Sequence, residues 1–270
     1  MSKNILFDRL REGDICLGLG LSYGAPGLVE GMCKGWDFVW VDGQHGALDY
    51  AACLGAIHAS AGVGVETVLR VPGHEFGIIG PMMDLAPSAL MVPMVDTPEQ
   101  AQSVVESTRF PPLGKRSYGG RRVIDVYGRE YVRERETMVI AQIETLEAVA
   151  CADKIIGTEG IDMLFFGPDD AKVRLNLPMS TGIYENDRLR EAMQQTAKAA
   201  VEAGKLCGTV AGNQPAIEMA MELGYRCFVC GSDISMLRTA AAAQLETMRA
   251  ASTQDSPSPG AAPGGGGGAY

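Results

Sequence analysis

Strand-like and helix-like segments alternate along almost the whole chain, and this alternation constrains the fold more than any other feature of the sequence. Short runs rich in β-branched and other apolar residues recur eight times, as expected for buried strands. They lie at residues 15–20, 38–42, 66–71, 89–95, 138–144, 163–167, 205–210 and 227–231. Segments with helical spacing separate them, at residues 47–60, 75–85, 97–107, 145–156, 187–203, 214–223 and 232–249. Eight strand–helix repeats in 270 residues predict an α/β fold, a closed (β/α)8 barrel of the TIM type.

Two segments lie outside this repeat. Residues 109–137 form a long insertion after the fourth strand, and we expect it to form a wall or lid of the active site, with a helix over residues 127–136. Residues 251–270 are rich in Pro, Gly and Ser and are expected to be disordered. The predicted organisation is one barrel domain over residues 1–250, including a C-terminal helix, followed by this tail.

A doubly wound open sheet is the alternative architecture. It would be favoured by a G-x-G-x-x-G turn after the first strand, and the GLGLSYG found there does not open a helix of that kind.

The composition argues against several classes of function. A net charge of -10 argues against nucleic acid or an anionic membrane surface as the main partner. No apolar leader with a small-residue cleavage site begins the chain and no stretch of about 18 apolar residues occurs, so we expect a soluble, cytoplasmic protein. The seven cysteines are odd in number and lie mostly in apolar segments, which is typical of buried side chains rather than of a disulfide framework.

Polar side chains with catalytic chemistry follow several of the predicted strands. Because parallel strands of a barrel end on the same rim, these side chains should converge although they are distant in sequence. Asp42 and His45 follow the second strand, Arg70 the third and Glu144 the fifth. The pair Asp169 and Asp170 follows the sixth strand.

The residue types suggest a metal-assisted reaction on an anionic substrate. Glu144 and one of the two aspartates supply hard oxygen ligands suited to Mg²⁺ or Mn²⁺, and two protein ligands leave positions for water and substrate. His45 is the best candidate base, and Arg70 can stabilise a developing enolate. The structural alternatives stay open: Glu144 as a cap of the next helix, the aspartates as an exposed turn, His45 as a structural histidine and Arg70 in a surface ion pair.

At these residues the sequence resembles the HpcH/HpaI family of metal-dependent (class II) pyruvate aldolases. The resemblance extends from about residue 5 to residue 237. It depends on the order and placement of the motifs VDGQHG (41–46), LRVPG (69–73), LMVPMVDTPEQA (90–101), RFPPLGKR (109–116), QIET (142–145), EGIDMLFFGPDD (159–170) and GNQP (212–215). The implied fold is the barrel type that binds phosphoenolpyruvate or pyruvate.

The resemblance implies which residues hold the metal and the substrate. Glu144 and Asp170 match the metal ligands, for Mg²⁺ or Mn²⁺ with Co²⁺ or Zn²⁺ as alternatives. Gln142 lies beside the substrate, and the backbone amides around Gly167, Pro168 and Asp169 receive the pyruvate carboxylate. Relatives have a GP-x-D-Leu-Ser pattern where this chain has Asp169 and Lys172, so substrate choice is the property that this departure affects.

The resemblance also implies the catalytic residues and the assembly. His45 matches the base, with Asp42 near it and Asp84 paired to it, and Arg70 binds the keto oxygen. The family is typically a hexamer, a trimer of dimers that exchanges its C-terminal helix, so residues 232–249 would pack on a neighbour. Tyr118, where relatives have an Arg-Gly pair, would reshape the pocket.

The predicted function is a metal-dependent lyase that cleaves or forms the C–C bond of 4-hydroxy-2-oxo acids through a pyruvate enolate, with pyruvate or oxaloacetate and an aldehyde as partners. The closest alternative is an oxaloacetate decarboxylase of the macrophomate synthase type. A Schiff-base aldolase using Lys172 and a catalytically inactive barrel that serves as a scaffold are further alternatives. Arg116, Arg121 and Arg122 in the insertion indicate either an acidic second substrate or a solvated basic face.

Overall fold

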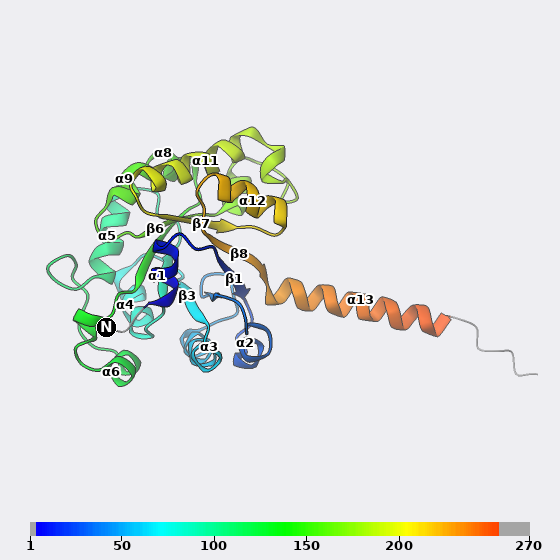
Figure 1. Cartoon of the computed structure of the whole chain (residues 1–270), viewed down its shortest axis with the longest axis horizontal. Coiled ribbons are helices and arrows are strands. Elements are labelled where there is room, and N and C mark those ends of the chain that lie inside the picture. Colours follow the sequence, from blue (N-terminus) through cyan, green and yellow to red (C-terminus); the bar gives the residue numbers. More distant parts are fainter. Residues whose placement is uncertain (1–3, 254–270) are drawn as a thin grey trace, which may run out of the picture. The chain divides into compact units, whose positions relative to one another are not determined.

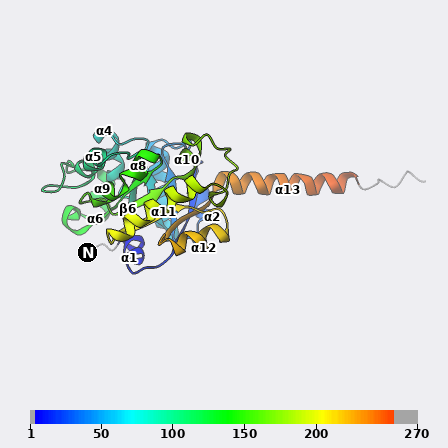
Figure 2. The same cartoon turned by 90° about the horizontal axis from the view of Figure 1, so that it is seen from above.

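The computed structural model describes residues 4–253 and consists of a closed barrel surrounded by helices (Figures 1 and 2). All neighbouring strands are parallel and follow the order of the sequence, β1 to β8, with β8 closing on β1. The strands are β1 (Cys16–Leu21), β2 (Phe38–Asp42), β3 (Glu66–Arg70), β4 (Ala89–Val92), β5 (Met138–Ile143), β6 (Met163–Phe166), β7 (Leu206–Val210) and β8 (Cys227–Ser232). The predicted (β/α)8 barrel and its eight strands are confirmed.

Helices lie between consecutive strands, before the first strand and after the last. They are α1 (Ile5–Arg11), α2 (Pro26–Met32), α3 (Tyr50–Val63), α4 (Phe76–Asp84), α5 (Pro98–Thr108), α6 (Arg121–Tyr127), α7 (Tyr131–Glu134), α8 (Leu146–Ala150), α9 (Ala152–Gly157), α10 (Pro168–Arg174), α11 (Asp187–Glu202), α12 (Gln214–Glu222) and α13 (Asp233–Thr253), with a 3₁₀ turn at Ile183–Glu185. Side-chain caps fix several of the starts: Asp49 accepts from the N–H of Ala52, and Thr97 forms a capping box with Gln100. No helix of residues 4–253 is long and apolar enough to cross a bilayer.

Two glycines of the barrel strands lie against aromatic rings of the interior. A Cβ on Gly18 of β1 would lie 2.2 Å from the ring of Phe38, and one on Gly208 of β7 would lie 2.9 Å from the ring of Phe165. Glycines on one side therefore make room for aromatic rings from the other side. Phe7 of α1 joins the same interior cluster and covers its amino-terminal end. This packing fills the interior of the barrel below the pocket at the carboxyl rim.

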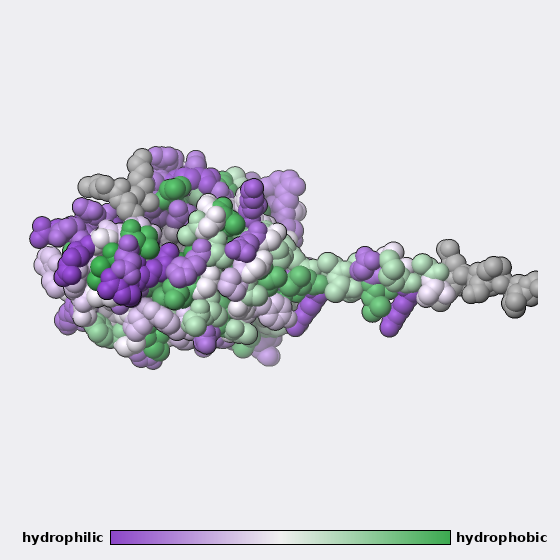
Figure 3. All heavy atoms as spheres, turned by 90° about the horizontal axis from the view of Figure 1, so that it is seen from below, coloured by the Kyte–Doolittle hydropathy of each residue, from purple (hydrophilic) through white to green (hydrophobic). Residues whose placement is uncertain are grey.

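The chain divides into two compact units, Met1–Asp233 with the barrel and Ile234–Tyr270, and each is described by itself. Helix α13 carries apolar side chains at its own surface (Figure 3): Met236, Leu237, Leu245 and Met248 are between 36% and 55% exposed. The predicted helix over residues 232–249 corresponds to α13. The predicted tail lies, from residue 254 onward, outside the described residues.

The predicted position of the insertion is wrong. Residues 109–137 follow α5, which has already returned the chain to the amino-terminal ends of the strands, so the insertion lies at the end of the barrel opposite to the carboxyl rim. It therefore forms no wall of a site at the carboxyl rim of its own barrel, and Tyr118 does not reshape that pocket. The helix expected over residues 127–136 is also interrupted: α6 ends before Gly128, whose φ of 81° breaks the helix, and α7 starts at Tyr131.

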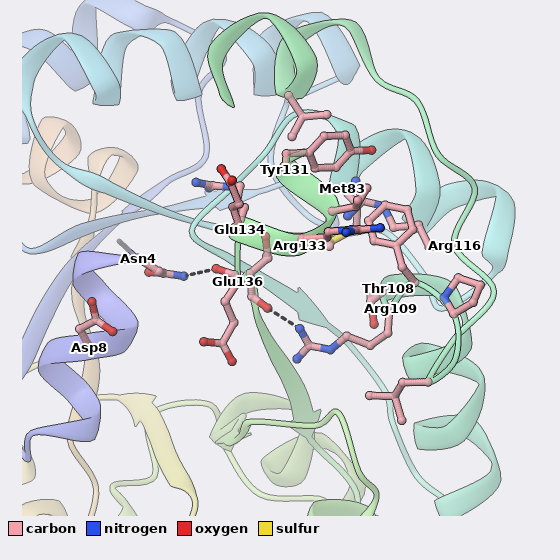
Figure 4. A pocket seen from close by; sticks show the side chains of 17 residues that line it. Asn4, Asp8, Met83, Thr108, Arg109, Arg116, Tyr131, Arg133, Glu134 and Glu136 are labelled. Carbon is pink, nitrogen blue, oxygen red and sulfur yellow. Dashed lines mark hydrogen bonds between the residues drawn. The ribbon is translucent and has the colours of Figure 1, made fainter. Parts of the chain in front are cut away.

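The insertion encloses a hollow of about 870 Å³ at the amino-terminal end (Figure 4). Its walls are largely held by internal hydrogen bonds. Asn4 donates to the carbonyl oxygen of Glu136 at 3.0 Å, and Arg109 donates to the carbonyl oxygen of Thr137 at 2.9 Å. Arg109 also forms an ion pair with Asp162 at 2.5 Å. This hollow is larger than the one at the carboxyl rim, yet none of the residues predicted to be catalytic lines it, so volume alone does not identify the active site.

Candidate active site

The residues predicted for the site meet in one pocket of about 240 Å³ at the carboxyl rim. Strands β2, β3, β5 and β6 each contribute from their last residues or from the loop that follows, because parallel strands end together. Nine of the ten predicted residues line this pocket: Asp42, His45, Arg70, Gln142, Glu144, Gly167, Pro168, Asp169 and Asp170. The exception is Asp84.

Arg70 is held rigidly at the centre of the rim. Its Nε and Nη2 atoms donate to the two carboxylate oxygens of Asp42 at 2.9 Å and 2.7 Å, and its Nη1 lies 3.5 Å from Oε1 of Gln142. Arg70 and Asp42 are 6% and 8% exposed, so this is a buried ion pair in register across β2 and β3. A bidentate pair of this kind fixes the plane of the guanidinium. The alternative of a surface ion pair is therefore wrong.

Asp42 remains charged in spite of its burial. Burial by itself would raise its pKa, but the hydrogen bonds and charge of Arg70, together with the backbone N–H groups of His45 and Gln44, outweigh burial and lower the pKa below its usual value. Both N–H groups donate to Oδ1 of Asp42 at 3.1 Å. Asp42 thus folds the loop that presents His45 as well as orienting Arg70.

Glu144 is the most perturbed carboxyl group of the pocket. It is 3% exposed, and its hydrogen bond is to the N–H of Met94, which donates to Oε2 at 3.0 Å. Burial raises the pKa of Glu144 to about 7, and the nearby charge of Asp170 also raises it, while the Met94 N–H and Arg70 act in the opposite direction. Met94 has a φ of 54°, a strained value for a residue with a side chain, and this conformation aims its N–H at Glu144.

Asp170 approaches Glu144 from the next strand because the chain turns sharply at Gly167. A Cβ on Gly167 would lie 2.8 Å from Cγ of Glu144 and 3.2 Å from Nε2 of Gln142, so only glycine leaves room for both side chains. Pro168 then starts α10, which carries Asp169 and Asp170 in its first turn. Helix α10 itself was not predicted, because the segment is short and polar.

The predicted amides that receive a carboxylate need a correction. The N–H of Gly167 donates to the carbonyl oxygen of Ile143 at 2.9 Å, and Pro168 has no N–H. Of the three residues, only Asp169 offers an N–H in the first turn of α10, where the helix does not use it. Among these three residues, only the N–H of Asp169 is therefore available to a substrate carboxylate.

The alternative that Glu144 caps the following helix is wrong, since Thr145 is the N-cap of α8 and accepts from the N–H of Ala148 at 2.9 Å. His45 is an exposed residue on the pocket wall. Glu144 is therefore not used as a helix cap, and His45 lies where a catalytic base was predicted.

Asp84 does not pair with His45 within this chain, so the predicted pairing is wrong for a single protomer. Helix α4 runs opposite to the strands, and its last residue, Asp84, therefore lies at the amino-terminal end of the barrel. There Arg116 donates to its Oδ1 at 3.0 Å. A pairing with His45 requires a second copy of the chain.

The chemistry of the pocket fits a divalent cation. Glu144 and Asp170 are two carboxylates on one wall, and the raised pKa of Glu144 reflects burial beside another negative charge, which a cation would relieve. Within residues 4–253 no group of three or more His, Cys, Asp or Glu side chains is arranged around a common point. Two protein carboxylates are the predicted ligand set, and Mg²⁺ commonly completes such a set with water and substrate oxygens.

Lys172 is placed unfavourably for Schiff-base chemistry. Its Nζ donates to Oδ1 of Asp169 at 3.0 Å and to the carbonyl oxygen of Met179 at 3.3 Å, and the residue does not line the pocket.

Sequence reasoning missed several residues of the pocket wall, above all Trp40. This residue lies two positions before Asp42 on β2, and the period of two along a strand would have placed both side chains in the barrel. The other missed residues are Gly20, Ser22, Val210, Val229, Gly231 and Ser232.

Comparison with known proteins identifies the kind of enzyme. The family model described as HpcH/HpaI aldolase/citrate lyase matches residues 28–240, most of the barrel. The chain belongs to this family. It is 32% identical to the hydroxypyruvate/pyruvate aldolase of Delftia acidovorans, over 93% of this chain and 94% of that protein. It is 34% identical to the 4-hydroxy-2-oxovalerate aldolase of Novosphingobium aromaticivorans, over 83% and 86%.

The HpcH/HpaI fold is also shared with solved structures. An HpcH/HpaI aldolase/citrate lyase family protein from Burkholderia cenocepacia superposes with a TM-score of 0.83 at 30% identity, covering 92% of this chain and 100% of that chain. A citrate lyase β subunit from M. tuberculosis, solved with oxaloacetate and magnesium, shares only the fold, with a TM-score of 0.55 at 18% identity over 82% and 93%. The predicted family, enzyme class and fold are confirmed: the chain is an aldolase of the HpcH/HpaI family, a carbon–carbon lyase.

Proposed function

We propose that this aldolase cleaves and forms the C3–C4 bond of 4-hydroxy-2-oxo acids and that it requires a divalent cation, Mg²⁺ or Mn²⁺, held by Glu144 and Asp170. The observation that carries the proposal is the buried Glu144, whose pKa is raised to about 7 by burial and by the nearby charge of Asp170, in a pocket that Arg70 also lines. A buried acid beside a second acid is unfavourable unless a cation joins them. The cation would supply Lewis acidity toward the oxygens of the 2-oxo acid.

Arg70 stabilises the negative charge that develops on the keto oxygen during cleavage. The bond to Asp42 holds its guanidinium in place before the substrate arrives, so little reorganisation is needed as charge develops. The N–H of Asp169, at the start of α10, is placed to bind the substrate carboxylate. These groups hold the C1–C2 end of the substrate and leave C3 and C4 toward the open rim.

His45 removes the proton of the 4-hydroxyl group. As that proton leaves, the C3–C4 bond breaks, the aldehyde departs, and the electron pair of the bond remains on C3 as the pyruvate enolate. Protonation at C3 then gives pyruvate. In the opposite direction the enolate attacks the aldehyde, and His45 returns the proton to the new hydroxyl group.

Aldol cleavage needs a base for the 4-hydroxyl proton, and His45 on the pocket wall can serve as that base. Loss of CO₂ from oxaloacetate gives the same enolate and needs no base for a hydroxyl proton. The His45→Ala variant should therefore lose most of its pyruvate release from 4-hydroxy-2-oxo acids and retain pyruvate release from oxaloacetate. Equal loss on both substrates would contradict this role of His45.

The metal requirement is tested with one pair of variants and one control. Glu144→Ala and Asp170→Ala should each lower aldol cleavage by about 10³-fold, the size expected from losing several kcal/mol of charge stabilisation. Asp187→Ala is the matched control, because Asp187 is an exposed carboxylate of α11 that does not line the pocket. Full turnover of the Glu144 or Asp170 variant in excess EDTA would contradict the proposal.

We further propose that the enzyme acts as a homo-oligomer, a hexamer built as a trimer of dimers. Two observations support this: Asp84 is out of reach of His45 within one chain, and α13 has exposed apolar side chains along its own surface, including Leu245 and Met248. Leu245→Glu combined with Met248→Glu should give a smaller species in sedimentation velocity. An unchanged sedimentation coefficient would contradict a role of α13 in assembly.

The pairing between protomers can be tested by complementation. His45→Ala and Asp84→Ala should each be weakly active alone. Co-expressed, they should form some sites that combine an intact His45 with an intact Asp84 of the neighbour, so activity should recover. If the recovered activity does not exceed that of the two variants measured separately, the pairing between protomers is wrong.

A further inference from the structure

Trp40 lies inside the barrel, directly beneath the residues of the proposed site. It precedes Asp42 by two positions on β2, so both side chains point inward. It lines the same pocket as Arg70 and Glu144 and packs against the interior cluster that contains Phe165. Trp40 thus forms part of the floor on which a bound substrate would rest.

The indole ring supports Arg70 from below. The Cζ atom of Arg70 lies 4.5 Å from the centre of the Trp40 ring, within the range of a cation–π contact. The Trp40 ring also contacts Phe165: the centres of the two rings are 5.9 Å apart, and their planes make an angle of 45°. The guanidinium is therefore held by Asp42 through hydrogen bonds and by Trp40 through its ring.

The indole N–H of Trp40 has no hydrogen-bond partner among residues 4–253. Its Nε1–H is buried and makes no hydrogen bond with any described residue. A buried indole N–H normally finds an acceptor, because leaving it unpaired is unfavourable. The mechanism above gives this donor no role.

The protein side chains on the open side of the pocket leave this donor without an acceptor. Gly20 and Gly231 have no side chains, and Val210 and Val229 are apolar. Ser22, Gln142 and Ser232 also line the pocket, yet no described residue accepts this hydrogen bond, so an oxygen of a molecule bound in the pocket can supply the acceptor. Oxygen atoms of a small 2-oxo acid are acceptors of suitable size for a hollow of about 240 Å³.

We propose that Trp40 binds the 2-oxo acid directly, its Nε1–H donating to an oxygen of that substrate while its ring positions Arg70. This inference rests on the proposed function, since it assumes that the pocket holds a 2-oxo acid. In this role Trp40 determines the affinity for the pyruvate-like half of the substrate. None of the sequence motifs indicated this residue.

The test separates the N–H from the ring. Trp40→Phe keeps an aromatic ring under Arg70 and removes the donor, so we expect the KM for the 2-oxo acid to rise about tenfold, with kcat within about threefold of the wild-type value. Trp40→Leu also removes the ring, so kcat should fall as well as KM rising. Trp36→Phe is the matched control and should leave both parameters unchanged, because Trp36 precedes β2 and does not line the pocket.

A spectroscopic readout keeps the test independent of turnover. The chain has two tryptophans, so Trp36→Phe leaves Trp40 as the only indole fluorophore. Titration of this variant with pyruvate, with Mg²⁺ alone as the reference, should change the emission of Trp40 along a saturating curve. Hydroxypyruvate is titrated in parallel, and a saturating change with either acid supports the contact.

Two failures are distinguishable. If the wild-type enzyme does not act on any 2-oxo acid, the proposed function fails. If the wild-type enzyme is active but Trp40→Phe has an unchanged KM and saturating pyruvate leaves the emission of Trp40 unchanged, only the role of Trp40 is overturned.

Discussion

The two ends of the barrel use the same kind of ion pair for different purposes. At the amino-terminal end Asp162 is paired with Arg109, which also binds the carbonyl oxygens of Thr137 and Gly160. At the carboxyl rim Arg70 is paired with Asp42, but the neighbouring Glu144 has no cationic partner among residues 4–253 and accepts a backbone N–H instead. At the amino-terminal end the arginine is joined only to groups of the protein, whereas at the carboxyl rim the pair lies beside a carboxylate that has no cationic partner within residues 4–253.

Glycines in the barrel interior and at the carboxyl rim make room for different kinds of side chain. In the barrel interior Gly18 and Gly208 make room for aromatic rings that fill the core. At the carboxyl rim Gly167 makes room for Glu144 and Gln142, two polar side chains that face a pocket. The same absence of a Cβ therefore supports packing in one region and brings polar groups together in the other.

The strongest test of this comparison replaces the two arginines. Arg70→Ala should lower kcat by about 10³-fold, because the developing charge on the keto oxygen loses preorganised donors and Asp42 loses its partner. The measurement is steady-state kinetics with saturating Mg²⁺. Arg109→Ala, measured per folded protein, should leave kcat unchanged. Equal losses in the two variants would show that the two ends are not functionally different.

Replacing Arg109 should affect the stability of the fold rather than catalysis. Arg109→Ala should lower the free energy of unfolding by about 3–4 kcal/mol, because Asp162 would stay largely buried without its partner. Chemical denaturation monitored by circular dichroism measures it. The control is Lys115→Ala, whose pair with Glu106 is exposed and should contribute less than about 1 kcal/mol. If both substitutions have the same small effect, Arg109 does not stabilise the amino-terminal end.

The affinity for the metal should depend on pH because Glu144, a proposed ligand, can be protonated. Since its pKa is about 7 in the folded protein, a proton competes with the cation below that pH, and the dissociation constant for Mn²⁺ should rise about tenfold per pH unit as pH falls. Electron paramagnetic resonance of free Mn²⁺ between pH 5.5 and 8.5 measures it. Affinity that is independent of pH down to 5.5 would contradict the assignment.

Metal affinity should rise with pH, whereas the contribution of Glu144 to the stability of the metal-free protein should fall as pH rises. The folded pKa of Glu144 lies above its ordinary value of 4.5, so the stabilisation associated with its protonated form is complete below pH 4.5 and is lost as pH rises through about 7. Glu144→Gln should therefore raise the melting temperature of the metal-free protein at pH 8 more than at pH 5.

The smallest expected effect concerns Lys172. Lys172→Met should change kcat by less than about threefold, because its Nζ is bonded to Asp169 and lies outside the pocket wall. Borohydride treatment in the presence of pyruvate should add no mass to the wild-type protein. A stable adduct at Lys172 would instead support a Schiff-base mechanism.

The sequence by itself determined the barrel and most of the rim. The periods of apolar residues located the strands, and parallel strands must end together, so Asp42, Arg70 and Glu144 could be placed on one rim before any coordinates were known. Direction along the chain was harder to read: the insertion was placed at the wrong end because α5 had already reversed the chain. Asp84 cannot pair with the His45 of its own chain, because α4 ends at the opposite rim.

Only the tertiary structure decided which polar groups have partners. Pairing of Arg70 with Asp42, burial of Glu144 beside Asp170 and the unpaired Nε1–H of Trp40 depend on which side chains share one pocket. Local sequence patterns specify periodicity and turns, but burial and charge pairing arise from residues that are far apart along the chain and meet only when the barrel closes.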